Sequence, residues 1–211
     1  MTKMEKWLED NGVKEGEGMS YLFGGLPHWG SKRFSEMTQQ EMQNLRDYRW
    51  ECINEFSFSV LTQEIVDLFK TSSKSFLEVG SGTGYWAWEL SQAGVDIVAT
   101  DPKPYTHIHY REEFPRKCWV KPEKLNARNA LKRYPGRTLL MSWPCLGEKW
   151  AFHTLKAYTG DKFIYVGEWN GCCAEESFFE LLEKEWKVVL DYKLRQWEGI
   201  HDCLWILERK Q

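Results

Sequence analysis

The sequence has no apolar run that approaches the roughly 18 to 20 residues needed to span a bilayer. Its first six residues, Met1–Lys6, also lack the apolar stretch of a secretion signal. These two absences argue against a membrane protein and against a secreted one. The sequence therefore predicts a soluble, cytoplasmic protein with no membrane partner.

Metal-binding cysteine patterns and a strong charge excess are absent too. The six cysteines are scattered, with no C-x-x-C pair and no C-x-x-C…H-x-x-x-H ligand set, so they are predicted to be reduced and mostly structural, and no metal site is expected. Lys and Arg number 28 against 31 Asp and Glu, which gives a net charge of -3. This balance argues against nucleic acid as a partner.

A chain of 211 residues suits one domain of ordinary size. Residues 1–74 are predicted to form a helical cap or lid, interrupted by the Gly- and Pro-rich stretch 24–30. In residues 75–211, short apolar runs alternate with helical patterns, which predicts an α/β core with a mostly parallel sheet and helices on both faces. The expected strands are 76–79, 95–100, 138–142 and 163–166, followed by an antiparallel hairpin of 186–194 and 203–207.

The first of these strands runs into Glu78-Val79-Gly80-Ser81-Gly82-Thr83-Gly84, and a helical pattern follows at once. Glycines let the backbone turn sharply and let a ligand approach the main chain without meeting a Cβ atom. Dinucleotide folds use the spacing G-x-G-x-x-G, whereas this turn reads G-x-G-x-G, with Tyr85 where the last glycine would fall. The spacing therefore favours a nucleotide-like ligand without a pyrophosphate. Asp101 ends the next strand, 21 residues after Gly80, where a carboxylate can accept hydrogen bonds from both ribose hydroxyls.

With these residues the chain resembles the class I S-adenosylmethionine (SAM) dependent methyltransferases, whose first motif is an acidic residue followed by x-G-x-G-x-G. The resemblance covers Ser75 to Arg209 and implies a Rossmann-like, seven-stranded, mostly parallel sheet that ends in the antiparallel hairpin. It implies SAM as the cofactor, with Asp101 on the ribose and Asn126 against the adenine amino group; a helix N-cap is the alternative role of Asn126. The other expected cofactor residues are Glu78, Gly80, Ser81, Gly82, Thr83, Gly84 and Ser142.

Ligands of an open parallel sheet bind beyond the carboxyl ends of its strands, so the loops after these strands and the hairpin turn 196–202 should share one rim. A hydroxyl acceptor needs a nearby base, and this rim offers His201, Asp202 and Glu168 as catalytic residues. His201 is the preferred base because imidazole titrates near neutrality, with Asp202 or Glu168 orienting it. Two alternatives stay open: His201 and Asp202 cap a hairpin turn, or Glu168 and Asp202 share a divalent cation such as Mg²⁺.

Four tryptophans fall on the cap loop or on the expected rim loops: Trp29, Trp143, Trp169 and Trp197. Flat aromatic faces pack well against sugar rings, so they are expected to bind substrate, with core packing as the alternative for each. The leading functional hypothesis is SAM-dependent O-methylation of a sugar hydroxyl in a small-molecule or glycan acceptor. The stretch Ser142-Trp143-Pro144-Cys145 partly resembles the [DNS]-P-P-[YF] signature of amino-methylating enzymes. Alternative hypotheses are therefore N-methylation of a nucleobase or another amine, and a non-catalytic scaffold that binds SAM.

Residues 111–137 contain nine basic and three acidic residues. Four of the basic residues are expected to share a helix face: Lys121, Lys124, Arg128 and Lys132. This face is interpreted either as a solvated surface or as a docking patch for a phosphorylated or nucleic-acid acceptor.

Overall fold

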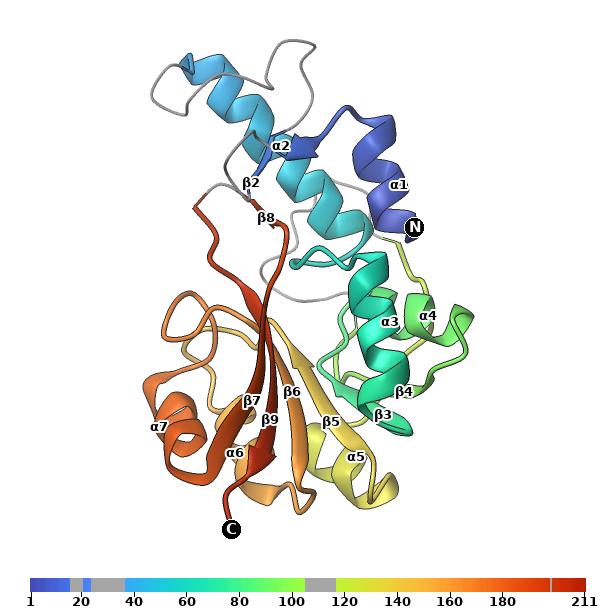
Figure 1. Ribbon diagram of the computed structural model, residues 1–211, viewed down its shortest axis with the longest axis vertical. Coiled ribbons are helices and arrows are strands. Elements are labelled where there is room, and N and C mark those ends of the chain that lie inside the picture. Colours follow the sequence, from blue (N-terminus) through green and yellow to red (C-terminus); the bar gives the residue numbers. More distant parts are fainter. Residues whose placement is uncertain (16–20, 24–36, 105–116, 198) are drawn as a thin grey trace.

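The computed structural model describes residues 1–15, 21–23, 37–104, 117–197 and 199–211. Within these residues the main sheet has six strands in the order β4-β3-β5-β6-β9-β7 (Figure 1). The first four are parallel, and β9 runs antiparallel between β6 and β7. The strands are β3 (Ser75–Val79), β4 (Asp96–Thr100), β5 (Thr138–Ser142), β6 (Lys162–Gly167), β7 (Trp186–Lys193) and β9 (Cys203–Arg209). The predicted Rossmann-like α/β sheet with a C-terminal antiparallel hairpin is thus confirmed.

The predicted seventh strand of this sheet is reduced to one residue in the described part of the chain. Glu123 forms a single parallel bridge to Thr100, on the open side of β4. The backbone N–H of Asp101 donates to the Glu123 carbonyl at 3.0 Å, and the Glu123 N–H donates to the Ala99 carbonyl at 3.0 Å. Pro122 precedes this residue and can offer no N–H to a ladder, which is one reason why the pairing does not extend.

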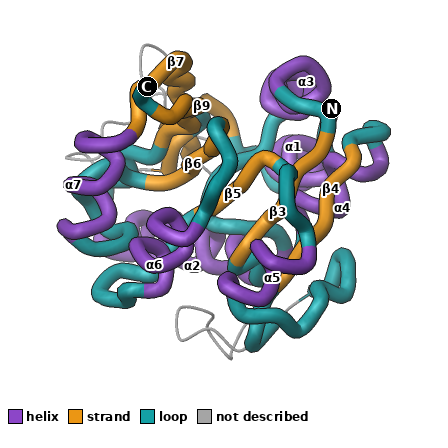
Figure 2. The backbone as a smooth tube through the Cα atoms, turned by 90° about the horizontal axis from the view of Figure 1, so that it is seen from below, coloured by secondary structure: helices purple, strands orange, loops and turns teal. Residues whose placement is uncertain are grey.

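Helices cover both faces of the sheet because apolar side chains of each central strand alternate between two clusters. One face of the sheet packs on α1 (Lys3–Asp10), α3 (Gln63–Ser72) and α4 (Tyr85–Gln92). The other face packs on α5 (Ala127–Arg133), α6 (Trp150–Ala157) and α7 (Glu176–Glu185). Along β6, for example, Ile164 belongs to the first cluster and Tyr165 to the second. Figure 2 shows the sheet between these two helical layers.

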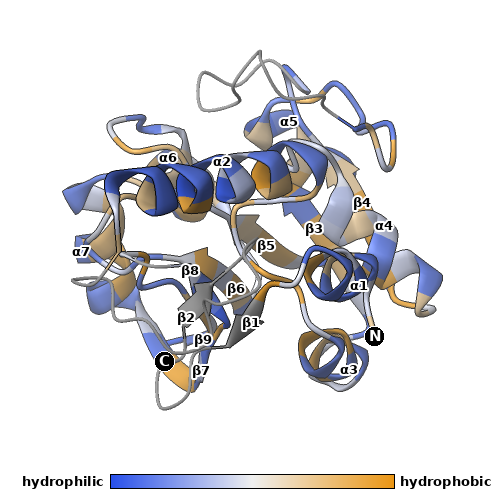
Figure 3. Cartoon of the chain, turned by 90° about the horizontal axis from the view of Figure 1, so that it is seen from above, coloured by the Kyte–Doolittle hydropathy of each residue, from blue (hydrophilic) through white to orange (hydrophobic). Residues whose placement is uncertain are grey.

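The predicted N-terminal cap lies beyond the carboxyl ends of the parallel strands, except for its last helix, α3, which packs on a face of the sheet (Figure 1). Its main element is α2 (Gln39–Glu55), which begins at a capping box of Thr38 and Glu41 and crosses the top of the molecule (Figure 3). Two short strands, β1 (Lys14–Glu15) and β2 (Tyr21–Phe23), form a small sheet with β8 (Gln196–Trp197) from the hairpin turn. The sequence pattern predicted only helices here, because strands of two or three residues are too short to show a period of two.

No hydrophobic boundary lies at residue 74, the predicted end of the cap. Cap residues such as Leu8, Phe56 and Ile65 belong to the same buried cluster as Phe76 and Trp86 of the core. None of the helices in the described ranges has both the length and the apolar character that crossing a membrane requires.

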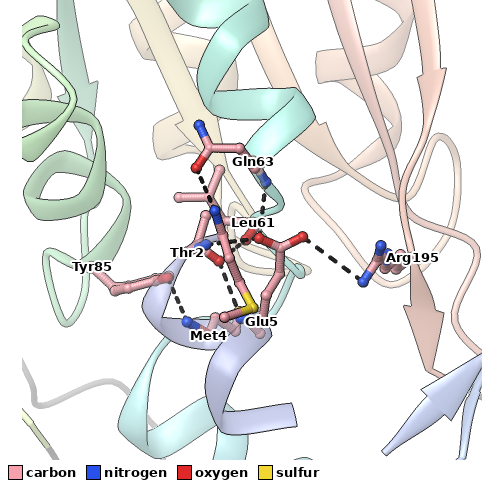
Figure 4. A network of polar contacts seen from close by, with 8 residues as sticks. Thr2, Met4, Glu5, Leu61, Gln63, Tyr85 and Arg195 are labelled. Carbon is pink, nitrogen blue, oxygen red and sulfur yellow. Dashed lines mark hydrogen bonds and ion pairs between the residues drawn. The ribbon is translucent and has the colours of Figure 1, made fainter. Parts of the chain in front are cut away.

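Glu5 links three parts of the fold through one buried carboxylate (Figure 4). Its Oε2 accepts hydrogen bonds from the backbone N–H groups of Thr2 at 2.7 Å and Gln63 at 3.1 Å, so it caps α1 and also the start of α3. Its Oε1 lies 3.8 Å from the Arg195 guanidinium, which follows β7. A neighbouring hydrogen bond runs from the Met4 N–H to the Tyr85 hydroxyl, so α1 also contacts the start of α4.

Replacing Glu5 by alanine should lower the free energy of unfolding by about 3 kcal/mol, because two helix N-termini lose a charged acceptor and the ion pair with Arg195 is lost. Asp10→Ala is the matched control on the same helix, since it removes only an exposed ion pair with Lys6 and should cost about 0.3 kcal/mol. Urea unfolding of both variants measures the difference. Equal losses would contradict the role of Glu5.

Candidate functional site

The turn between β3 and α4 is built from three glycines in the left-handed region of backbone space. Gly80, Gly82 and Gly84 have φ angles of 75°, 55° and 71°, which side chains with a Cβ atom adopt only at a cost. The N–H groups of Gly80 and Ser81 donate to the Thr100 carbonyl at 2.9 and 3.2 Å. The turn is therefore held by the end of β4.

Asp101 completes this turn. Its Oδ2 accepts the N–H of Gly82 at 3.0 Å, and its Oδ1 accepts the N–H of Lys103 at 2.8 Å. Each carboxylate oxygen has further acceptor capacity. A pair of hydroxyl groups, such as those of a ribose, can therefore bind a carboxylate that is already oriented.

Glu78 is buried at the end of β3, with 2% of its surface exposed. Burial raises the pKa of its carboxyl group to about 8; a hydrogen bond from the Ala87 N–H at the start of α4 opposes this rise, and the charge of Asp101 adds to it. Its Oε2 has no hydrogen-bond partner among the described residues, and neither has the buried Oγ of Ser81. Two buried polar atoms next to the glycine turn are thus left for a ligand.

Three other predicted cofactor residues have contacts within the protein. The Thr83 hydroxyl donates to the Phe56 carbonyl at the end of α2, so it connects the cap to the turn. Asn126 is the N-cap of α5, where its side chain accepts the Asn129 N–H at 2.9 Å. Ser142 ends β5 and pairs with Val166 of β6. Their contacts with SAM remain predictions.

Sequence reasoning missed Trp150, the first residue of α6. A Cβ atom placed on Gly80 would lie 3.0 Å from the Cη2 atom of the Trp150 ring, so this indole packs against the turn. On the opposite side, a Cβ atom on Gly84 would lie 2.8 Å from the Val120 carbonyl oxygen. The glycines are therefore required by close approach as well as by backbone conformation.

The predicted catalytic residues do meet at the rim, where the turn of the hairpin contacts the end of β6. Glu168 is 5% exposed and accepts two backbone N–H groups, from His201 at 2.8 Å and from Cys172 at 2.7 Å. Burial alone would raise the pKa of Glu168, but these hydrogen bonds and the charge of His201 lower it below its ordinary value. Gly171 leaves room for this carboxylate, because a Cβ atom there would lie 2.7 Å from Glu168 Oε2.

Asp202 is buried beside it, with 2% of its surface exposed. Its Oδ2 accepts the Ser59 hydroxyl at 2.5 Å and the Trp143 indole N–H at 3.3 Å, whereas its Oδ1 has no partner among the described residues. Burial raises the pKa of Asp202 to about 6; the hydrogen bonds from Ser59 and Trp143 oppose the rise. The His201 side chain, the preferred base on sequence grounds, is exposed at this rim.

Arg49, on α2, is the second residue that sequence reasoning missed at the rim. Burial lowers the pKa of its guanidinium, and the charges of Asp202, Glu168 and Cys172 raise it. Its Nε is buried and has no hydrogen-bond partner among the described residues. No sequence motif marks Arg49, so only its interaction with Asp202 and Glu168 in the folded chain identifies it.

The four predicted substrate tryptophans differ in environment. Trp143 is at the rim, in a left-handed conformation (φ 49°), and its ring stacks on Phe58 with centroids 5.2 Å apart. Trp169 packs edge-on against Trp205, and Trp197 is 2% exposed within the core. Trp29 lies outside the described residues. Substrate contacts of these residues remain predictions, and Trp197 has no exposed face for one.

The four basic residues expected on one helix face do not all lie on a helix, and the described residues also bear on the alternative of a divalent cation at Glu168 and Asp202. Only Arg128 and Lys132 lie on a helix, because α5 begins at Ala127; Lys121 and Lys124 precede it in irregular chain. No group of three or more His, Cys, Asp or Glu residues suited to a metal occurs in the ranges that the structure describes. Both oxygens of Glu168 already accept backbone N–H groups.

The position of β9 between β6 and β7, together with the glycine turn and Asp101, gives the fold of the class I SAM-dependent methyltransferases. No protein-family model and no curated protein matches this chain. Two solved structures of such methyltransferases are similar to it. A Streptococcus pneumoniae protein described as a candidate tRNA (m1A22) methyltransferase has a TM-score of 0.48 and 13% identity, over 72% of each chain. The ribosomal protein L11 methylase of Lactobacillus delbrueckii subsp. bulgaricus has a TM-score of 0.42 and 13% identity, over 72% of this chain and 82% of that one.

These comparisons correct the predicted partners. The two similar proteins are named for a tRNA and a ribosomal protein, which contradicts the prediction of a small-molecule or glycan acceptor with nucleic acid disfavoured as a partner. The sugar hydroxyl hypothesis rested on the tryptophans, and the argument against nucleic acid rested on net charge. Net charge sums over the whole surface and is silent on local patches, so it could not exclude a macromolecular acceptor.

The close contact at Gly84 yields a stability prediction. Gly84→Ala should lower the free energy of unfolding by about 3 kcal/mol, because the new Cβ atom meets Val120 and the backbone stays left-handed. Gly94→Ala is the matched control: its φ is 85° but no atom lies within 4 Å, so the cost should be about 1 kcal/mol. Guanidinium unfolding measures both, and equal costs would show that Val120 yields freely.

Burial of Glu78 predicts a pH dependence. Its pKa in the folded protein is about 8, above the ordinary 4.5, so the folded state binds the proton more tightly than the unfolded state. The stability contributed is complete below pH 4.5 and is lost as the pH rises through 8. Relative to Glu78→Gln, which stays neutral, the wild type should lose up to about 4 kcal/mol between pH 4.5 and 8.5. Asp202 is present in both proteins, so its titration contributes equally to both and cancels in the comparison. A difference in the free energy of unfolding between the two proteins that does not change with pH would refute the prediction.

Proposed function

We propose that this chain is a SAM-dependent methyltransferase. The observation that carries the proposal is the left-handed turn Gly80–Gly84 fixed onto the Asp101 carboxylate, with two unpartnered buried oxygens, Glu78 Oε2 and Ser81 Oγ, beside it. An adenosyl sulfonium with an amino-acid tail fits this set. It offers two ribose hydroxyls to Asp101 and an ammonium donor to Glu78 Oε2, and its tail can approach the turn without meeting side chains.

The bound cofactor would supply an electrophilic methyl group. The residues of this chain would position it, exclude water from it and hold the acceptor in line with the methyl carbon. Since the Gly82 N–H already orients Asp101, little reorganisation is needed when a ribose binds.

Residues of the rim would remove the proton from the acceptor. Glu168 and Asp202 are two carboxyl groups whose environments shift their pKa values in opposite directions. Such a pair is typical of active sites in which the two groups have different roles in proton transfer. Glu168 stays ionised, holds the hairpin turn by its backbone N–H groups and uses both oxygens for it. Asp202, with a pKa of about 6 and a buried oxygen without a partner, is the better proton acceptor near neutral pH.

Titration calorimetry with SAM tests the proposal. Asp101→Asn keeps an oxygen for the Gly82 N–H but loses the charge that binds hydroxyls, so SAM affinity should fall about 30-fold. Asp96→Asn, at the other end of the same strand, removes an exposed ion pair with Arg137 and should leave SAM affinity unchanged. No binding of SAM by the wild type, or binding of NADH in its place, would overturn the proposal. SAM binding without methyl transfer to any acceptor would support a scaffold.

A further inference from the structure

At the rim, two buried polar atoms of opposite character have no hydrogen-bond partner among the residues that the structure describes. Asp202 Oδ1 is a hydrogen-bond acceptor, and Arg49 Nε–H is a donor. They come from opposite sides, the hairpin and the cap helix α2, and Arg49 is close enough to interact electrostatically with both Asp202 and Glu168. Unpartnered buried groups are costly in a folded protein, so a pair at a candidate active site points to a ligand that satisfies both.

The complementary ligand presents a donor beside an acceptor. Nucleobases with an exocyclic amine next to an unprotonated ring nitrogen have such an edge: the amine N–H can donate to Asp202, and the ring nitrogen can accept from Arg49. Adenine, cytosine and guanine carry this group, whereas uracil does not. The aromatic pair Trp143 and Phe58 lies next to Asp202, as the hydrogen bond from the Trp143 indole shows, so a flat ring would meet aromatic neighbours there.

A second observation favours a base that belongs to a nucleic-acid strand. Four cations lie along the chain that passes the end of β4 and enters α5, and none forms an ion pair within the described ranges: Lys121, Lys124, Arg128 and Lys132. The start of this segment lies at the end of β4, because Glu123 bridges to Thr100 and its carbonyl accepts the Asp101 N–H; α5 then leads from this edge toward the start of β5. By contrast, the nearby Lys117 and Arg133 are ion-paired with Glu55 and Glu123. Cations near the end of β4 that form no ion pair with another described residue suit phosphates that flank a bound base.

We propose that the methyl acceptor is the exocyclic amine of a nucleobase in a nucleic-acid strand, held by Asp202 and Arg49 at the rim. The inference rests on the proposed function. In the transfer, the amine nitrogen bonds to the methyl carbon as the bond from that carbon to sulfur breaks, and its electron pair stays on sulfur. The proton of the amine passes to Asp202 and then to solvent. No oxidant or further reactant is required.

A labelling experiment tests the acceptor. The full chain is incubated with methyl-tritiated SAM and a random-sequence RNA pool or DNA pool, with poly(U) as the matched polymer that has phosphates but no exocyclic amine. Digestion to nucleosides should place the label on the amine nitrogen of adenosine, cytidine or guanosine, and none on poly(U). Label on uridine or on ribose would overturn the inference. So would an absence of label from every pool while SAM binds, and in that case the proposed function would survive.

Variants of the two rim residues separate catalysis from structure. Asp202→Asn should lower kcat about 100-fold or more and leave SAM affinity within about twofold of wild type. Arg49→Gln should raise the KM for the pool about 10-fold with a smaller effect on kcat, and Arg49→Lys should not rescue it, because an ammonium group does not reproduce the Nε donor. Arg46→Gln, an exposed change on the same helix, is the matched control. Rescue by Arg49→Lys, or unchanged kcat in a folded Asp202→Asn, would overturn the assigned roles.

The salt dependence of binding to the RNA pool tests whether the acceptor base belongs to a nucleic-acid strand. Replacing Lys124 and Arg128 together by glutamine should reduce the slope of log affinity for the RNA pool against log salt by about 1.4, as expected for two lost phosphate contacts on a single strand. Lys6→Gln, an exposed cation on α1, should leave that slope unchanged. An equal slope for the double variant and the wild type would show that the phosphates bind elsewhere.

Discussion

The structure depends on how the chain leaves β3. It must reverse direction, meet the end of β4 and begin α4 within five residues, and it does so through three left-handed glycines. The N–H groups of the turn are directed to Thr100 and Asp101, which makes the neighbouring strand its scaffold. A cofactor site of this kind is preorganised, since the donors, the acceptor and the direction of α4 are set by the sheet before any ligand arrives.

The same turn determines where the cap lies. The last carbonyl groups of a helix have no hydrogen-bond donor within the helix. At the end of α2, two of these carbonyls accept hydrogen bonds from residues near the glycine turn. The Thr83 hydroxyl donates to the Phe56 carbonyl, and the Trp119 indole donates to the Glu55 carbonyl at 2.6 Å. Fixing the end of α2 in this way places Arg49, earlier on the same helix, over the rim. The glycine turn and the rim are therefore connected through the end of one helix.

Sequence patterns predicted the core of the fold and the convergence of the rim. The strand and helix alternation, the glycine spacing and the hairpin each have local signatures, and the meeting of Glu168, His201 and Asp202 followed from the rule that parallel strands end at one edge. Arg49 and Ser59 could not be predicted, because their roles depend on the path of the cap. Thr83 illustrates a second limit: a motif shows which residues form the turn, but not which side chains face a ligand and which contact a neighbouring helix. The predicted class of methyl acceptor was wrong because neither the number of tryptophans nor the net charge of a chain identifies its binding partner.

The small sheet made of β1, β2 and β8 has a kinetic consequence. It joins Tyr21 to Gln196 and Leu22 to Trp197, so it closes a loop of most of the chain for only a few backbone contacts. Loops of that length form slowly, because closing the loop lowers the conformational entropy of the chain before the new contacts can stabilise it. The hairpin that carries Asp202 is part of this closure, and the cap above it is the other part. Pairing of β2 with β8 therefore brings the cap and the hairpin together, so assembly of the rim depends on a contact between residues about 175 positions apart in the chain.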